Sequence, residues 1–153
     1  MRTPATIKHH PIHPILVTFP IALWVFSLAA DIIRFFSLGP PDVWREIAFY
    51  SMAAGIVGAL LAALPGLIDL FSITDPKLKR VGIIHMVLNL IVVAIFAIDW
   101  SLRFTQVDLT LPMILSVFGV ILLVIAGWLG ADLVHEHRVS VEEPRQQPPP
   151  VRL

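Results

Sequence analysis

The stretch IAFYSMAAGIVGALLAALPGLI, residues 47–68, decides the fold of this chain because it contains no charged residue. As a helix it is about 33 Å long, which suffices to cross a hydrocarbon core of roughly 30 Å. Residues 109–131 form a second uncharged run of similar length, and residues 15–30 and 81–98 are nearly as apolar. The sequence therefore predicts four membrane spans, at about residues 14–36, 46–68, 80–102 and 109–134.

The composition indicates one membrane domain rather than a soluble one. Hydrophobic residues make up 57% and charged residues 14% of the chain, which leaves too little polar surface to cover a soluble globule. Turn residues such as Gly39-Pro40 and Asp75-Pro76 separate the apolar runs by short loops, so neighbouring helices are antiparallel. We expect an all-α, integral membrane four-helix up-down bundle. The predicted divisions are an N-terminal segment, the four-helix domain and a disordered proline-rich tail, over residues 1–13, 14–137 and 138–153.

The 11 Lys and Arg residues are divided unevenly between the two ends of such a bundle. Eight belong to the N-terminus, the middle loop and the C-terminus, which share one side, whereas three belong to the other side: Arg34, Arg45 and Arg103. Cytoplasmic segments carry the excess of Lys and Arg. Both termini are therefore predicted to be cytoplasmic.

Several function classes are excluded by what the sequence lacks. With no cysteine, the chain cannot form disulfides, attach a c-type haem or hold an iron–sulfur cluster through thiolates. It contains no nucleophile elbow, phosphate-binding glycine loop or HExxH helix, and its net charge of zero indicates no nucleic-acid partner. We therefore expect an electron-transfer or accessory subunit rather than an enzyme, with any cofactor held by His, carboxylate or Met.

The histidines gather at the predicted cytoplasmic end of the bundle. His85 lies six residues beyond Lys79, about 9 Å along a helix, and therefore below the lipid headgroups. Asn89 lies one turn further on the same face, where it can fix the imidazole tautomer. Ionisable groups at such depth usually face the bundle interior. The six histidines are His9, His10, His13, His85, His135 and His137.

The two predicted hairpins resemble each other and indicate helical-hairpin repeats. In each, a helix that begins near a histidine, His13 or His85, is followed by a glycine-bearing helix that ends near an aspartate, Asp69 or Asp132. Repeats about an axis along the membrane normal would make the two histidines face each other diagonally, with the aspartates beside them. At the other end, sequence spacing predicts two ion pairs, Asp31 with Arg34 and Asp99 with Arg103.

Small residues form a stripe on the second and fourth predicted helices. Such a stripe is explained by close helix packing, and it could equally provide clearance for a flat cofactor. Two prolines inside the spans, Pro20 and Pro65, are predicted to kink their helices. The stripes consist of Gly55, Gly58, Ala62 and Gly66, and of Gly119, Ala126, Gly127 and Gly130.

A set of short motifs follows in a fixed order along residues 9–141. They are the start His13-Pro14 with Val17-Thr18-Phe19-Pro20, the segment Gly66-Leu67-Ile68-Asp69, His85 with Asn89, and residues 127–134 followed by His137. Together they resemble a bacterial family of four-span predicted membrane proteins that is catalogued as a domain of unknown function.

The resemblance implies a multi-pass protein of the bacterial inner membrane. Some members of the family are joined to Rieske-type iron–sulfur domains, which implies proximity to quinol and electron-transfer chemistry. This chain departs from the family at its end, where His137-Arg138-Val139-Ser140-Val141 replaces the usual His-Gly-Val-Gly-Val. It therefore lacks the glycines for a tight turn after His137.

Three functions remain open from the sequence. In the first, His13 and His85, with Asn89 beside them, bind one haem b in an electron-transfer subunit, with a redox membrane complex or a quinone as partner. In the second, a non-haem zinc or iron site is formed by mixed imidazole and carboxylate ligands. In the third, the chain is a cofactor-free accessory subunit of a larger membrane complex, or a homo-oligomer packed through its small-residue faces. The ligands of the second alternative would be His13, Asp69, His85, Asp132 and His137.

Overall fold

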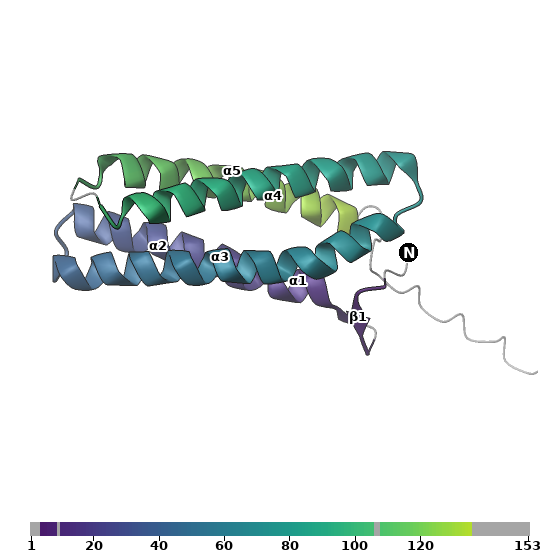
Figure 1. The fold of residues 1–153 in the computed structure, drawn as a ribbon, viewed down its shortest axis with the longest axis horizontal. Coiled ribbons are helices and arrows are strands. Elements are labelled where there is room, and N and C mark those ends of the chain that lie inside the picture. Colours follow the sequence, from purple (N-terminus) through teal and green to yellow (C-terminus); the bar gives the residue numbers. More distant parts are fainter. Residues whose placement is uncertain (1–3, 9, 106–107, 136–153) are drawn as a thin grey trace, which may run out of the picture.

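The computed structural model describes residues 4–8, 10–105 and 108–135 and confirms an all-α four-helix bundle (Figure 1). Each of the four spans is a helix long and apolar enough to cross a membrane, the first being interrupted once at Val17. A two-stranded ribbon, β1 (Thr6–Ile7) and β2 (His10–Pro11), precedes them. The helices are α1 (Ile12–Leu16), α2 (Thr18–Phe35), α3 (Pro41–Ser72), α4 (Pro76–Leu102) and α5 (Thr110–His135).

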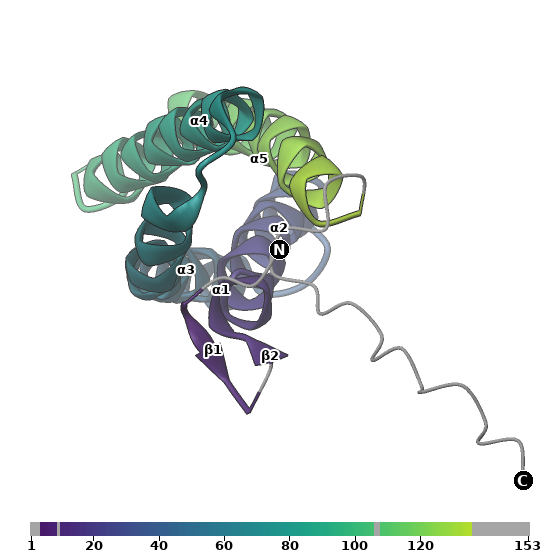
Figure 2. The ribbon, with the colours of Figure 1, turned by 90° about the vertical axis from the view of Figure 1, so that its right-hand side faces the viewer.

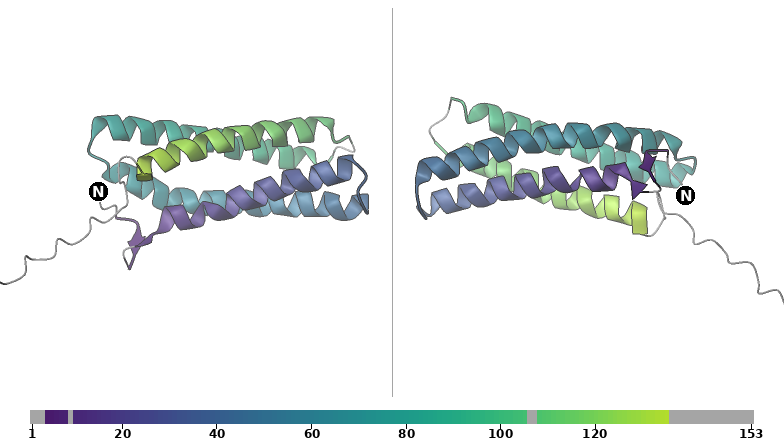
Figure 3. Two further views of the ribbon diagram at one scale, coloured as in Figure 1. Left: turned by 180° about the vertical axis from the view of Figure 1, so that it is seen from behind. Right: turned by 90° about the horizontal axis from the view of Figure 1, so that it is seen from below.

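The bundle consists of two antiparallel hairpins laid against each other. The first hairpin pairs α2 with α3, and the second pairs α4 with α5 (Figure 2). Across the boundary, α3 contacts α4 and α2 contacts α5, so that α2 and α4 lie diagonally. The ribbon β1–β2 and the last turns of α5 lie at the same end (Figure 3).

The helix boundaries follow from the turn residues that the sequence analysis used. Gly39 has a φ of +95°, a backbone conformation that glycine adopts without strain. Asp75 caps α4, because its Oδ1 accepts hydrogen bonds from the amides of Lys77 and Leu78 at 2.8 and 3.2 Å. Pro76 follows as the first helical residue, where its missing N–H costs nothing.

Both prolines within the spans coincide with a departure from a straight helix. Pro65 lies inside α3, and the final turns of that helix bend out of line in Figure 1, as the sequence predicts. At Pro20 the first span is interrupted three residues earlier, at Val17, between α1 and α2. This interruption agrees with the predicted kink, because proline has no N–H to bond the carbonyl four residues back.

Two aromatic rings meet at the centre of the bundle. Trp24 of α2 stacks on Phe96 of α4 with ring centroids 4.4 Å apart and planes within 10° of parallel. Its indole Nε1 donates to the carbonyl of Met52 at 3.3 Å. Gly55 and Gly119 admit the two rings, since a Cβ there would lie 2.5 Å from Trp24 Nε1 and 2.9 Å from Phe96. Most other large apolar side chains are exposed on the outside, as lipid contact requires.

Candidate functional site

Two histidines on diagonal helices are held in the same way. The Nδ1 atom of His13, on α1, lies 2.8 Å from the carbonyl oxygen of Ala62 on α3. The Nδ1 atom of His85, on α4, lies 2.8 Å from the carbonyl oxygen of Ala126 on α5. A carbonyl can only accept, so both Nδ1 atoms carry hydrogen and both Nε2 atoms retain a lone pair while the rings are neutral.

The two imidazoles lie next to each other across the boundary between the hairpins. Their ring centroids are 6.3 Å apart and their planes are perpendicular. The diagonal placement of His13 and His85 that the hairpin repeat predicts is therefore present. The structure thus brings together two imidazole side chains from different hairpins. Each is oriented by a backbone carbonyl of the second helix of its own hairpin.

Glycines make room for these rings. A Cβ on Gly66 would lie 2.7 Å from His13 Nδ1, and a Cβ on Gly130 would lie 2.8 Å from His85 Cε1. The small-residue stripe thus serves close packing at these positions, and the histidines themselves fill the space that it leaves. Gly127 is different, because a Cβ there would meet nothing within 4 Å. It faces outward and does not belong to the packed stripe.

Asn89 holds the ring of His85 from the same helix. Its Nδ2 donates to the carbonyl oxygen of His85 at 2.8 Å and lies 3.2 Å from His85 Nε2. The bond to the carbonyl of His85 fixes the side-chain amide of Asn89. The contact with Nε2 lets the same amide donate to the ring nitrogen that does not bond Ala126. Asn89 therefore positions the imidazole, as its spacing in the sequence predicts.

The two aspartates predicted near the histidines have different surroundings. Asp69 is buried, and its Oδ1 accepts the amide of Ala5 at 3.0 Å, which fastens the N-terminal segment to α3. Asp132 is only partly buried. It follows Gly130 by one residue fewer than Asp69 follows Gly66, which rotates it by about 100° around its helix. His137 lies outside the described residues, and within them no group of three or more His, Cys, Asp or Glu side chains could hold a metal ion.

The opposite end of the bundle contains a buried ionic cluster. Arg103 binds Asp31 of α2 through two hydrogen bonds of 2.8 and 2.7 Å and Asp99 of α4 at 2.9 Å. The hydroxyl of Ser116 on α5 donates to Asp99 at 2.7 Å. The predicted pair of Asp99 and Arg103 is confirmed. The predicted pair of Asp31 and Arg34 is wrong, because Asp31 faces the bundle interior and binds the guanidinium that arrives from the other hairpin.

The sequence analysis missed how far the hairpin repeat extends. Trp24 follows His13, and Phe96 follows His85, by the same distance of about three helical turns, which places each aromatic ring on the face that carries the histidine. Gly55 and Gly119 stand in the same relation to Gly66 and Gly130. Aligning the histidines and then searching each helix at this spacing would have revealed these contacts.

Comparison with known proteins identifies a family. The profile of a family described as predicted membrane protein, DUF2231, matches residues 9–143. No curated protein and no solved structure matches the chain.

Proposed function

This chain belongs to the DUF2231 family of predicted membrane proteins, and we propose that it is a membrane electron-transfer subunit that binds one b-type haem through His13 and His85. The observation that carries the proposal is the matched pair of imidazoles. The ring centroids of His13 and His85 are 6.3 Å apart, so the two side chains are close enough that they could hold one iron between them.

The number of donors favours haem over a bare metal ion. A haem iron needs only axial ligands from the protein, since the macrocycle fills its other positions, and two histidines satisfy it. A zinc or non-haem iron site needs three or four protein ligands. Within the described residues only two imidazoles converge, and no third acidic or histidine side chain completes a metal-binding group.

The surroundings of the two histidines suit axial ligands. The hydrogen bonds from Nδ1 to the carbonyls of Ala62 and Ala126 leave Nε2 as the ligating atom, fix the ring orientation and raise its basicity. The haem would supply one-electron exchange. The imidazole rings occupy the space beside Gly66 and Gly130. These two glycines would therefore position the ligating histidines and would not make room for the macrocycle. Asn89 must release Nε2 of His85 when that atom ligates.

The test is the absorption spectrum of protein purified from haem-supplemented bacterial membranes, air-oxidised and then reduced with dithionite. We expect a Soret band with sharp reduced α and β bands in the wild type, and loss of both in His13→Ala and His85→Ala. His10→Ala is the matched control, because His10 is exposed and its Nδ1 bonds only to the nearby carbonyl of Lys8. It should retain the spectrum.

A featureless spectrum in the wild type would overturn the haem proposal. Metal analysis of the same preparation would then test the zinc or iron alternative with Asp69, Asp132 and His137. If no stoichiometric metal is found, affinity purification from membranes would test the accessory-subunit alternative, with His13 and His85 replaced together. Assembly with a partner complex that survives this replacement would support a cofactor-free role.

For the membrane placement we propose a bacterial inner membrane with both termini in the cytoplasm and a quinone or a redox complex as partner. The excess of Lys and Arg at the end that carries the termini supports this orientation. Since the chain has no cysteine, a single cysteine can be introduced at the exposed Leu38 or at Ser140 and labelled with a membrane-impermeant maleimide in intact cells. Labelling at position 38 alone is expected, whereas labelling at position 140 alone would show the opposite orientation.

A further inference from the structure

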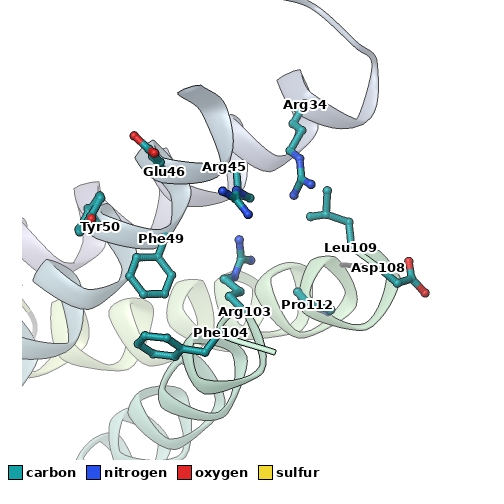
Figure 4. Close-up of a pocket in the computed structure, with 10 residues that line it drawn as sticks. All are labelled: Arg34, Arg45, Glu46, Phe49, Tyr50, Arg103, Phe104, Asp108, Leu109 and Pro112. Carbon is teal, nitrogen blue, oxygen red and sulfur yellow. The ribbon is translucent and has the colours of Figure 1, made fainter. Parts of the chain in front are cut away.

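A cavity of about 270 Å³ opens at the end of the bundle opposite the histidines (Figure 4). Three arginines line it, and each comes from the end of a different span: Arg34 near the end of α2, Arg45 in the first turns of α3 and Arg103 directly after α4. Figure 4 shows their guanidinium groups directed toward one another. The side chains of Glu46 and Asp108, at the edge of the cavity, point away from them.

The charges of these arginines are not equally compensated. Arg103 is bound to two buried carboxylates, Asp31 and Asp99. Arg34 and Arg45 make no ion pair within the part of the chain that the structure describes. Like charges repel, and among the described side chains neither Arg34 nor Arg45 has a carboxylate that offsets this repulsion. An anion between the guanidinium groups would remove this cost.

The cavity lies at the depth of the lipid headgroups. The 32 residues of α3 make a helix of about 48 Å, whereas a bilayer including its headgroups is about 40–45 Å thick. The ends of the spans therefore reach the headgroup region. The outer wall of the cavity is aromatic, with Tyr50 and Phe104 exposed by 66% and 63% of their surface. Phe49 packs against Phe104 with ring centroids 4.9 Å apart, which makes this wall continuous.

From this arrangement we propose that the cavity binds the phosphate group of an anionic phospholipid. Arg34 and Arg45 bind the phosphate oxygens through charge-assisted hydrogen bonds, which a guanidinium can form two at a time. Arg103 closes the inner side of the site and stays bound to its carboxylates. The aromatic wall packs along the lipid beside the headgroup. A free phosphate has the same recognition chemistry but no contact with the aromatic wall.

The experiment measures lipid retention by native mass spectrometry of full-length protein in nanodiscs of phosphatidylglycerol and phosphatidylcholine. The test variant is Arg34→Gln with Arg45→Gln, and the control is Arg80→Gln, which removes an exposed charge at the other end. We expect the wild type and the control to retain phosphatidylglycerol. The double variant should lose roughly tenfold in affinity per guanidinium removed.

Three further readouts decide the outcome. Arg34→Lys with Arg45→Lys should bind with intermediate affinity, and the thermal midpoint of each variant reports whether it is folded. Inorganic phosphate added to pure phosphatidylcholine nanodiscs identifies the source of the anion, since stabilisation that depends on Arg34 and Arg45 would assign the site to a free phosphate instead of a lipid. Equal retention of phosphatidylglycerol by the folded glutamine variant and the wild type, without an effect of phosphate, would overturn the proposal.

Discussion

The two ends of this bundle bury polar side chains in opposite ways. At the end where the β1–β2 ribbon and the last turns of α5 lie, one ring nitrogen each of His13 and His85 is hydrogen-bonded to a helix carbonyl. At the other end, Arg103 is shared between Asp31 and Asp99. The first arrangement is nearly symmetric and needs no charge, whereas the second is asymmetric and ionic.

This difference indicates which of the two buried polar groups has an atom free to bind a ligand. In the ionic cluster the guanidinium donates to both carboxylates and to Ser116, so the cluster has little capacity for a ligand and joins the two hairpins. The Nε2 of a neutral imidazole keeps a lone pair that can ligate a metal. We therefore expect the cluster of Arg103, Asp31 and Asp99 to stabilise the bundle and the histidine pair to serve the proposed haem binding, and the following variants test that division.

The largest effect is expected from Arg103→Met. This change leaves two aspartates, Asp31 and Asp99, buried at 0% exposure without their counter-ion, which costs about 3–5 kcal/mol in comparable buried pairs. Thermal unfolding in detergent should show a much lower midpoint, whereas Arg80→Met, which removes an exposed charge, should leave it unchanged. A midpoint equal to that of the wild type would mean that the ionic end does not join the hairpins.

Next in size is Gly55→Ala in the centre, between the two ends. The added methyl would lie 2.5 Å from Trp24 Nε1 and force the stacked indole to move, and such overpacking typically costs about 1–3 kcal/mol. Gly127→Ala is the matched control, because its methyl meets no atom within 4 Å. Chemical denaturation of both variants checks this, and equal stability would contradict the packing role of Gly55.

A more selective effect is expected from Gly66→Ala and Gly130→Ala. Each methyl would displace one imidazole and weaken its hydrogen bond to the carbonyl of Ala62 or Ala126. We expect haem affinity to fall by about 10- to 100-fold while helix content stays unchanged, as measured by haem titration and circular dichroism. Undiminished haem binding in both variants would separate the glycines from the ligand geometry and weaken the functional assignment of this end.

The smallest effect is expected from Asp69→Ala, which removes the acceptor of the Ala5 amide. The loss should be about 1 kcal/mol and should appear as faster hydrogen exchange of that amide. Asp132→Ala should not change this exchange, because no described amide depends on Asp132. Protection of Ala5 that survives in Asp69→Ala would show that the N-terminal segment is held by other contacts.

The sequence predicted the class of fold and the four apolar helices because both depend on local properties of each segment. Apolar runs without charge define the spans, and Pro and Gly define the turns. It failed for Asp31, because the predicted pair with Arg34 considered only neighbours on one helix, whereas the actual partner, Arg103, comes from the other hairpin. The repeat also matched Asp69 with Asp132, although their distances from Gly66 and Gly130 differ by one residue, which turns a helix by about 100°.

By itself, then, the sequence determined that this chain forms four membrane-spanning helices in two similar hairpins, with its histidines at one end. The length of each apolar run, the positions of the charged residues and the turn-forming Pro and Gly residues act locally, so they can be recognised from the sequence alone. Only the tertiary structure decided that Trp24 stacks on Phe96 and that Arg103 binds Asp31. Each of these contacts joins different hairpins, and its geometry depends on how the helices are rotated about their axes when they pack.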